Sequence, residues 1–586
     1  MLRLIVLIAF LATVALCHNR RCHCRPYEPC WPSDSRWQAL NNSIHGNLVA
    51  VRPVGYECHD PAFDKTACEE VTAMGRNSTW RAAHPGALQW QNWEALPAAN
   101  QTCYLESHRP LPCGQGRISL YSAMVESPEH IQNVVRFARR HNVRLVIKNS
   151  GHDFSGRSST PQSLQISTNK MKTITFFDNF MARNTHGAPV SYGSAVKIGA
   201  GVLLKDLYAA VGAKGLAVVG GLSHTVGIAG GYIQGGGHSF LGTWKGMASD
   251  NALEFELITA SGDLLTVNEY QHSDLFWALR GGGGGTFGVV ASVTVRTFSD
   301  VPVERASLLF QISTENGTSF WNAIREIHSH LPSLNDAGGA GYYNIVPNSP
   351  QTNGTSVSSF DMVLHFLNRT DQEVVRHLFT PLVLSLRKYV GDGVFLAVDS
   401  YSQTRELFEE YLHNGSDTTG GFIILGSRMI SRDFLAREQG PSRLSMALSK
   451  LRQEPGDLIR GHVVAGGRVA HNITYTALNP AWRKTVTHIS IGHGWNANAT
   501  LADQKAIQAN ITNRELPILK SLEPGKMGAY LNEADANEVD FQTSFWGENY
   551  DRLYEVKQKW DADGLFITRL GVGSEDWDEE GFCRIG

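Results

Sequence analysis

The chain has 586 residues, a net charge of -3 and 42% hydrophobic residues. A single hydrophobic core seldom organises more than roughly 250–300 residues, so the length predicts two or three packed units. The small net charge and the lack of a lysine- or arginine-rich block argue against a nucleic-acid partner.

The first 17 residues predict a signal peptide that is removed on export. One early arginine precedes a short apolar run, which ends in small residues over 12–17. The run is too short for a membrane anchor, and no later stretch approaches ~20 apolar residues, so we expect no transmembrane helix. Ten Asn-x-Ser/Thr sequons, spread from Asn41 to Asn510, fit passage through the secretory route.

Eight cysteines follow Cys17, seven of them within the first 113 residues. In an oxidising compartment they would pair as disulfides. We interpret residues 18–115, which are also rich in Trp, Pro and Asn, as a disulfide-stapled cap. The pattern allows Cys583 to be tied back to this segment, although the sequence leaves the connectivity open. Cys22-x-Cys24 lacks the second ligand pair of a zinc site, so no metal is expected.

From residue 121 onward, helical and extended patterns alternate. Ser127 as N-cap and Pro128 at the first helical position predict a helix. Residues 143–148 predict a buried strand that ends in a glycine turn. A hairpin is predicted around Ser261-Gly262. Residues 300–520 alternate helices and strands without glycine-rich loops, which favours a separate substrate domain.

The first motif with chemical potential is a tight loop at 148–156, with His152 at its tip. Small residues on both sides let the backbone lie against a flat or anionic ligand, and the imidazole is then available as a nucleophile or ligand. Alone, this loop is weak evidence, because a lone histidine is more often a hydrogen-bonded structural residue.

Two glycine-rich stretches follow, at 220–239 and 274–290. Consecutive glycines free backbone N–H groups that suit a pyrophosphate. The first stretch is no Walker P-loop, because no Gly-Lys-Ser/Thr closes it, and it lacks the clean GxGxxG of a Rossmann fold. A flexible linker would lack its interleaved Val, Ile, Leu and Tyr.

Together, these motifs resemble the PCMH-type FAD-binding domain of the vanillyl-alcohol-oxidase superfamily, in its berberine-bridge-enzyme-like branch, over residues 118–298. The tail, with Tyr530-Leu531-Asn532 and the run from Phe545 to Asp561, resembles the C-terminal signature of that branch. The resemblance implies an α+β fold: a two-subdomain FAD-binding domain at 116–298, an α/β substrate domain at 299–529, and a C-terminal segment at 530–586 that returns to complete the FAD site.

The resemblance also implies how FAD would be held. His152 would be joined to the flavin 8α-methyl. Asn549 and Tyr550 would close over the cofactor, and the isoalloxazine and diphosphate would be lined by Gly151, Gly156, Ser223, Thr225, Gly227, Gly231 and Val290. Many members of the branch carry a second, thioether link from a cysteine where this chain has Ser223. A hydroxyl forms no such bond, so we expect a single attachment and a somewhat weaker oxidant. Gly231 falls near the position where a small residue admits O₂.

The carboxylates just before the tail motif are candidates for the acid–base group. With strand alternation, Glu538 and Asp540 would share a face, opposite Val539. We select Glu538, because apolar neighbours would raise its pKa and keep it protonated near neutral pH. Asp540, Tyr530 and His238 are weaker candidates, and Glu533 is expected nearer solvent, with little effect.

Three functions remain open at this stage. The first is O₂-dependent oxidation of a small, polyketide-type secondary metabolite by a secreted, monomeric enzyme without nucleic-acid or membrane partners. The second is redox-neutral double-bond isomerisation, with Glu538 as general acid, and the third is a redox-silent FAD glycoprotein. The run 564–577 resembles the fungal isoamyl-alcohol-oxidase-like group and, beyond it, the berberine-bridge-like enzymes of cytochalasan pathways.

Overall fold

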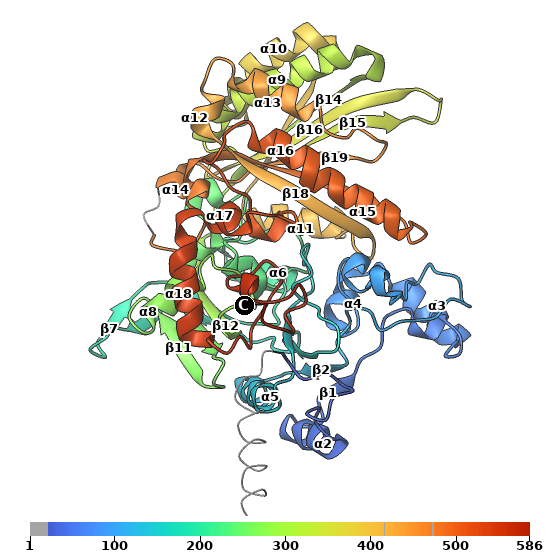
Figure 1. Cartoon of the computed structure of the whole chain (residues 1–586). Helices are drawn as coiled ribbons and strands as arrows, with labels where there is room; N and C mark the ends of the chain where they lie inside the picture. Colours follow the sequence, from blue (N-terminus) through green and yellow to red (C-terminus); the bar gives the residue numbers. More distant parts are fainter. Residues whose placement is uncertain (1–21, 415–416, 472–473, 586) are drawn as a thin grey trace, which may run out of the picture.

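The computed structural model describes residues 22–414, 417–471 and 474–585 (Figure 1). The predicted signal peptide, residues 1–17, lies outside these ranges. Within them, none of the helices combines the length and hydropathy that a membrane span requires.

The N-terminal part has little regular structure, as the composition of the predicted cap indicates. Its elements are α2 (Asp34–Ser43), β1 (Leu48–Ala50), α3 (Lys65–Met74) and α4 (Ser78–Ala83). The prediction that the cysteines form disulfides is confirmed. The eight cysteines of the described chain pair as Cys22–Cys583, Cys24–Cys30, Cys58–Cys68 and Cys103–Cys113.

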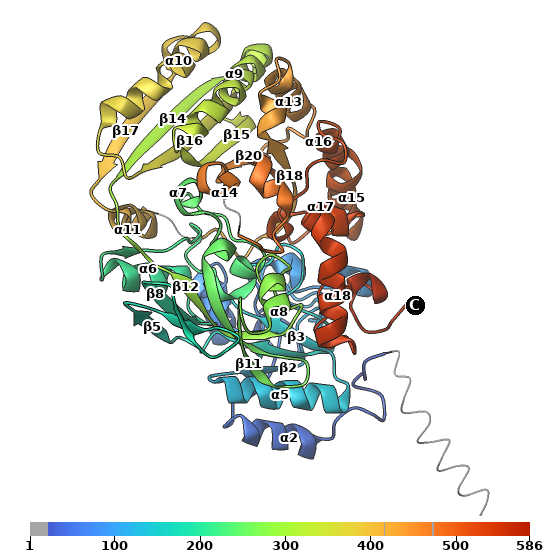
Figure 2. The same cartoon turned by 90° about the vertical axis from the view of Figure 1, so that its left-hand side faces the viewer.

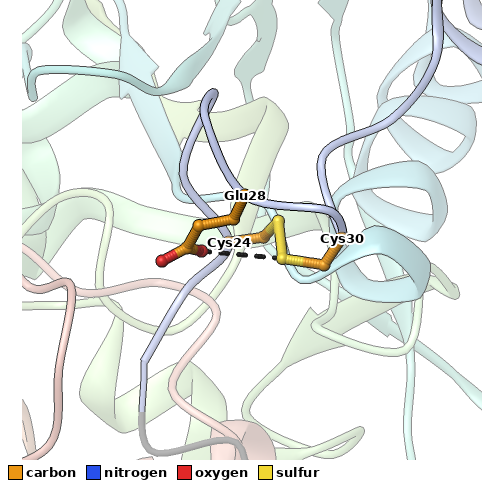
Figure 3. Close-up of side chains that lie close together, drawn as sticks. All are labelled: Cys24, Glu28 and Cys30. Carbon is orange, nitrogen blue, oxygen red and sulfur yellow. Dashed lines mark hydrogen bonds between the residues drawn. A yellow bond between two sulfur atoms is a disulfide. The ribbon is translucent and has the colours of Figure 1, made fainter.

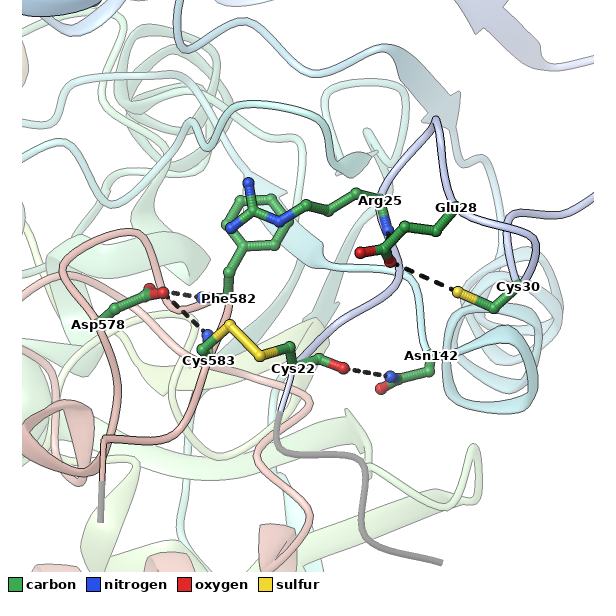
Figure 4. The surroundings of a disulfide bond; sticks show 8 residues. All are labelled: Cys22, Arg25, Glu28, Cys30, Asn142, Asp578, Phe582 and Cys583. Atoms are coloured by element: carbon green, nitrogen blue, oxygen red, sulfur yellow. Dashed lines mark hydrogen bonds between the residues drawn. A yellow bond between two sulfur atoms is a disulfide. The ribbon is translucent and has the colours of Figure 1, made fainter. Parts of the chain in front are cut away.

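One disulfide, Cys22–Cys583, joins residues 561 positions apart, so it ties the start of the described chain to its end (Figure 4). Asn142 Nδ2 donates to the Cys22 carbonyl at 2.8 Å. The Asp578 carboxylate accepts the backbone N–H groups of Phe582 and Cys583 at 2.7 and 3.0 Å. The start and the end of the described chain are therefore joined beside Asn142.

Another cysteine pair lies beside a carboxylate, in a group formed by Cys24, Glu28 and Cys30 (Figure 3). The two sulfurs are bonded to each other, so neither is the thiolate that a metal ion requires. Glu28 instead accepts the Arg25 backbone N–H at 2.8 Å. This group is structural.

The first sheet of the predicted FAD-binding region has the strand order β1-β2-β4-β3. Three of its strands are parallel, namely β2 (Tyr121–Met124), β4 (Leu164–Ser167) and β3 (Leu145–Lys148). Helix α5 (Pro128–His141) packs on it through buried Ile131 and Val134. Ser127 Oγ caps this helix by accepting the His130 N–H at 3.3 Å, as predicted. The loop that carries His152 leaves this sheet at the end of β3.

The second sheet is antiparallel, in the order β11-β10-β12-β8-β5. The predicted hairpin is β10–β11, with Ile258 opposite Leu264. The strands are β5 (Ile174–Phe177), β8 (Ala195–Gly199), β10 (Ala252–Ile258), β11 (Leu264–Asn268) and β12 (Val289–Arg296). Around them lie α6 (Leu204–Gly212), α7 (Gly242–Lys245), α8 (Ser273–Ala278) and the short strands β6 (Met181–Arg183), β7 (Pro189–Ser191), β9 (Leu216–Ala217) and β13 (Phe298–Ser299).

The predicted substrate domain is built on a seven-stranded antiparallel sheet, in the order β17-β14-β16-β15-β19-β20-β18. Its strands are β14 (Val303–Ser313), β15 (Ala340–Pro350), β16 (Ser356–Leu367), β17 (Phe395–Tyr401), β18 (Phe422–Ser431), β19 (Leu458–Val463) and β20 (Thr485–Trp495). Figure 2 shows α9 (Gly317–Asp336), α10 (Gln372–Val390) and α13 (Gly440–Leu448) on its outer face. The remaining helices are α11 (Thr404–Asn414), α12 (Arg432–Leu435), α14 (Gly467–His471), α15 (Leu501–Asn510) and α16 (Leu516–Lys520).

Strand alternation gives this sheet two different faces. On β15, Tyr343 and Ile345 enter the core beneath the helices, whereas Tyr342 and Asn344 point to the opposite side and line a cavity. On β19, Ile459 joins the core while Arg460 and His462 line the cavity. The face away from the helices is therefore a polar wall.

The tail returns to the FAD-binding region through α17 (Phe541–Trp546) and α18 (Tyr550–Asp561). Trp546 Nε1 donates to the Gly281 carbonyl at 3.0 Å, and Lys557 Nζ donates to the Thr286 carbonyl at 2.8 Å. The strand expected around Glu538 is absent, because residues 531–540 form a short 3₁₀ turn and loop.

A buried ion-pair group in the substrate domain predicts a pH-dependent stability. His493 contacts Asp457 at 2.9 Å and Glu515 at 2.7 Å. Burial disfavours the imidazolium, but the two carboxylates outweigh burial and raise the pKa of His493 from 6.5 to about 9. A raised folded-state pKa stabilises the fold fully below pH 6.5, and this contribution is lost as the pH rises through about 9. The thermal midpoint of the parent should therefore fall over pH 7–10 more steeply than that of His493→Gln; equal slopes would contradict the ion-pair interpretation.

Candidate active site

A cavity of about 1000 Å³ lies between the glycine loops and the polar wall of the seven-stranded sheet. One side is formed by the loop after β3, by residues 221–231 and by 284–290. The other side comes from β15, β16, β19 and β20. Tyr530, at the start of the tail, lies where the two sides meet, with its ring near both His238 and His488. Six of the predicted cofactor residues line it, namely Gly151, His152, Ser223, Gly227, Gly231 and Val290.

Close packing explains two of the glycines. A Cβ on Gly227 would lie 1.7 Å from Asn149 Oδ1, and a Cβ on Gly284 would lie 2.7 Å from the Gly231 Cα. A Cβ on Gly231 itself would meet nothing within 4 Å. The loops thus pack tightly against each other while Gly231 leaves open space toward the cavity.

His152 is held by a hydrogen-bonded relay. Its Nε2 lies 2.6 Å from Thr225 Oγ1, which donates to Asp417 Oδ2 at 2.5 Å. Because the hydroxyl proton goes to Asp417, the hydroxyl oxygen accepts the Nε2 proton, and the lone pair stays on Nδ1. These hydrogen bonds thus favour the tautomer of His152 whose unprotonated nitrogen is Nδ1.

Asp417 is fixed from several sides. It accepts the Ser223 hydroxyl at 2.9 Å and the backbone N–H groups of His224 and Thr225 at 3.1 and 3.0 Å. Burial acts to raise the pKa of Asp417, but hydrogen bonds from His152 and Thr225 hold it well below its usual range. Asp417 could not be identified from the sequence. Its sequence neighbours give no sign that it bonds to Ser223 and Thr225, almost two hundred positions earlier.

The other four predicted cofactor residues do not line the cavity. Thr225 lies behind His152, and Gly156 packs on Trp93, whose ring a Cβ would meet at 2.5 Å. Asn549 Nδ2 donates to the Leu478 carbonyl at 2.9 Å, and the Tyr550 hydroxyl donates to Glu575. We therefore correct the expectation for Asn549 and Tyr550, which brace the tail instead of closing over a ligand.

Tyr530 and Asn532 bring the tail into the cavity. Asn532 Nδ2 donates to the Tyr530 oxygen at 2.9 Å and lies 3.0 Å from the Gly231 carbonyl. Burial, helped by the neighbouring Glu533 carboxylate, raises the pKa of Tyr530. The Asn532 amide thus links the Tyr530 hydroxyl to the Gly231 carbonyl, so the hydroxyl lies on the cavity wall close to the first glycine-rich stretch.

The structure does not bring Glu538 to the cavity. Arg428 Nη2 donates to its two oxygens at 3.0 and 2.9 Å, and Lys520 Nζ donates at 2.5 Å. Burial acts to raise the pKa of Glu538, but these cations outweigh burial and lower it, the reverse of our expectation. Asp540 is exposed on the same stretch. Both are corrected as acid–base candidates.

Glu533, expected nearer solvent, instead lies on the cavity wall among histidines. Its Oε1 is 2.9 Å from His238 Nε2, and its Oε2 is 3.2 Å from His462 Nδ1 and 3.7 Å from His488 Nδ1. Burial acts to raise the pKa of Glu533, but His238 and His462 lower it well below its usual value. The sequence indicated only His238 here, since the other two histidines arrive from separate strands.

Comparisons with known proteins agree with this architecture. The FAD binding domain model matches residues 120–268, and the berberine and berberine-like model matches residues 529–573. An FAD-linked oxidoreductase of Arthroderma benhamiae is 49% identical over 99% of both chains. FAD-linked oxidoreductase malF of Malbranchea aurantiaca is 42% identical over 96% of this chain and 94% of its own.

A solved structure extends the agreement to the fold. The VAO-type flavoprotein MtVAO615 of Myceliophthora thermophila superposes with a TM-score of 0.85 and 31% identity, over 96% of this chain and 100% of its own. The predicted α+β fold with a PCMH-type FAD-binding domain is thereby confirmed. The chain belongs to the berberine-bridge-like family of FAD-linked oxidoreductases, which have the VAO-type fold.

Proposed function

We propose that this enzyme is an FAD-linked oxidase that removes a hydride from a small secondary metabolite and uses O₂ as its electron acceptor. The observation that carries the proposal is the cavity, which the glycine loops and Tyr530 both line. A relative named flavin-dependent oxygenase ucdF, from Aspergillus ustus, is 43% identical over 94% of this chain and supports a reaction with oxygen. Bound FAD would supply the hydride acceptor and the route of electrons to O₂.

The residues present fit FAD. Several glycines of the two glycine-rich stretches line the cavity, so a flat ring system could lie directly against their backbone (Gly227, Gly230, Gly231, Gly284 and Gly285). Val290 and Gly151 border the same space. Open space at Gly231 gives O₂ access to the face of such a ring.

Side chains beside this wall handle the substrate. Asn532 fixes the Tyr530 oxygen, so the hydroxyl is oriented to exchange a proton with a substrate bound in the cavity. Removing a positioned proton-transfer group typically lowers the rate by about 10²–10⁴-fold. The redox-neutral alternative relied on Glu538, and no observation now favours it.

We propose that His152 is the single covalent attachment site. Its lone pair on Nδ1 is prepared by Thr225 and Asp417, and Ser223 offers no sulfur for a second bond. The tryptic peptide 149–157 should carry the FAD mass, and the peptide 215–245 should not. His152→Ala should release its flavin on acid precipitation, while the parent pellet stays yellow.

Asp417→Asn tests the relay separately. It should lower the fraction of covalently bound flavin, because the amide accepts the Thr225 proton less strongly than a carboxylate. Noncovalent FAD should still bind between the glycine loops. If the 149–157 peptide of the parent enzyme carries no FAD, His152 is not the covalent attachment site.

We propose that the enzyme is exported as a monomer. The four disulfides of the described chain support an oxidising compartment. The expressed protein should shift in size on glycosidase treatment, elute as a monomer and show no reactive thiols when denatured. Eight reactive thiols in the denatured protein would contradict the disulfides and, with them, the proposed export.

The reaction itself is tested by mass balance. A panel of small fungal alcohols and amines is incubated with the enzyme in air and without oxygen. An oxidase yields products lighter by two hydrogens, with one peroxide for each turnover. Products of unchanged mass that form anaerobically and take up solvent deuterium would replace oxidation with isomerisation.

A further inference from the structure

Three side chains on the cavity wall, His238, His462 and Glu533, have atoms that could bind the same metal ion. His238, His462 and Glu533 each offer one ligand atom, and these three atoms lie within 4.8 Å of one another. They come from the end of the first glycine-rich stretch, from β19 and from the tail. Two imidazoles and one glutamate form a common ligand set of zinc sites that keep an open position.

The spacing of these atoms is close to, and slightly shorter than, the spacing around a bound cation. Metal–ligand bonds of ~2.0–2.2 Å in a tetrahedral site place neighbouring ligand atoms about 3.3–3.6 Å apart. His462 Nδ1 lies 3.2 Å from Glu533 Oε2 and 3.2 Å from His488 Nδ1. His488 Nδ1 is 3.7 Å from the same carboxylate oxygen, so His488 is within reach as a fourth donor.

Hydrogen bonding alone leaves part of this cluster unexplained. Glu533 Oε2 is buried, and its contact with His462 Nδ1 at 3.2 Å lacks the geometry of a good hydrogen bond. His488 Nε2 is buried without a hydrogen-bond partner among the described residues. Buried polar atoms in proteins are nearly always satisfied. A cation between the imidazoles and the carboxylate would satisfy Glu533 Oε2.

We propose that His238, His462 and Glu533 bind a divalent metal ion of the zinc class on the cavity wall, with His488 as an auxiliary ligand. His238, His462 and Glu533 line the cavity, whereas His488 is fully buried behind them. An open coordination position would therefore face the cavity, where it suits an oxygen atom of the substrate. The Tyr342 hydroxyl, 3.4 Å from His238 Nδ1, would orient that ring from behind. The inference deepens the proposed function by placing an oxygen-bearing substrate group at this wall.

The test measures metal and flavin on the same sample. Untagged full-length enzyme is incubated with zinc sulfate, desalted, and analysed for zinc by mass spectrometry and for flavin by absorbance. We expect one zinc per chain. His462→Ala and Glu533→Gln should each lower the zinc content at least tenfold while keeping the flavin. His365→Gln, on the same wall but bonded to Tyr411, should keep both.

Two outcomes would overturn the site. One is parent enzyme that carries flavin but retains less than a tenth of an equivalent of zinc after desalting. The other is undiminished zinc in both ligand variants. Neither outcome bears on the flavin or the oxidase reaction, because those are read from absorbance and peroxide. Loss of flavin in the parent would instead count against the proposed function.

Discussion

Tyr530→Phe should lower turnover by about 10²–10⁴-fold, the usual cost of removing a positioned proton-transfer group. The variant keeps the ring that packs against His238 and Trp482, so the fold and the flavin spectrum should be unchanged. Only the hydroxyl that Asn532 orients is lost. Stopped-flow measurement of substrate-driven flavin reduction reports this step directly.

Tyr550→Phe provides the matched control. This second tail tyrosine bonds to Glu575 outside the cavity, so its variant should reduce flavin at the parent rate. If Tyr530→Phe also reduces flavin at the parent rate, another group must accept the substrate proton, and Tyr530 is not the proton-transfer residue.

Glu538→Ala should lower the free energy of unfolding by about 3–5 kcal/mol, because it leaves a buried cation uncompensated. The side chains of Arg428 and Glu538 are 4% and 1% exposed, and Ser544 also donates to this carboxylate at 3.1 Å. Urea unfolding measures the change. The rate of flavin reduction per folded molecule should stay near that of the parent.

Asp540→Ala is the control for Glu538. This carboxylate is exposed, so its loss should change stability by no more than about 0.5 kcal/mol. Equal effects of the two variants would contradict a structural role for the Glu538 ion pair. Loss of flavin reduction in folded Glu538→Ala would restore the acid–base role expected from sequence.

The sequence alone was sufficient to predict features that depend on the backbone geometry of a few neighbouring residues. Ser127 and Pro128 start a helix, Ser261-Gly262 closes a hairpin, and the glycine stretches form one wall of the cavity. Each of these features depends on residues within a few positions of one another. His152 was recognisable for the same reason, since its loop directly follows a buried strand.

Residues that reach the cavity from distant segments could not be found in this way. Asp417 and His462 depend on how the substrate-domain sheet is placed over the glycine loops. The choice of Glu538 over Glu533 assumed a strand, whereas the segment is a turn and loop in which alternation carries no information. The sequence was therefore sufficient to predict the glycine loops on one side of the cavity. The residues on the strands of the seven-stranded sheet could be identified only from the tertiary structure.

Reoxidation of the reduced enzyme tests the proposed use of O₂ without any substrate. The enzyme is photoreduced without oxygen and mixed with buffer of known O₂ content, while flavin absorbance and peroxide are followed. We expect a rapid return of oxidised flavin with one peroxide for each flavin. Flavin that stays reduced for minutes in air, or protein that carries no flavin, would contradict it.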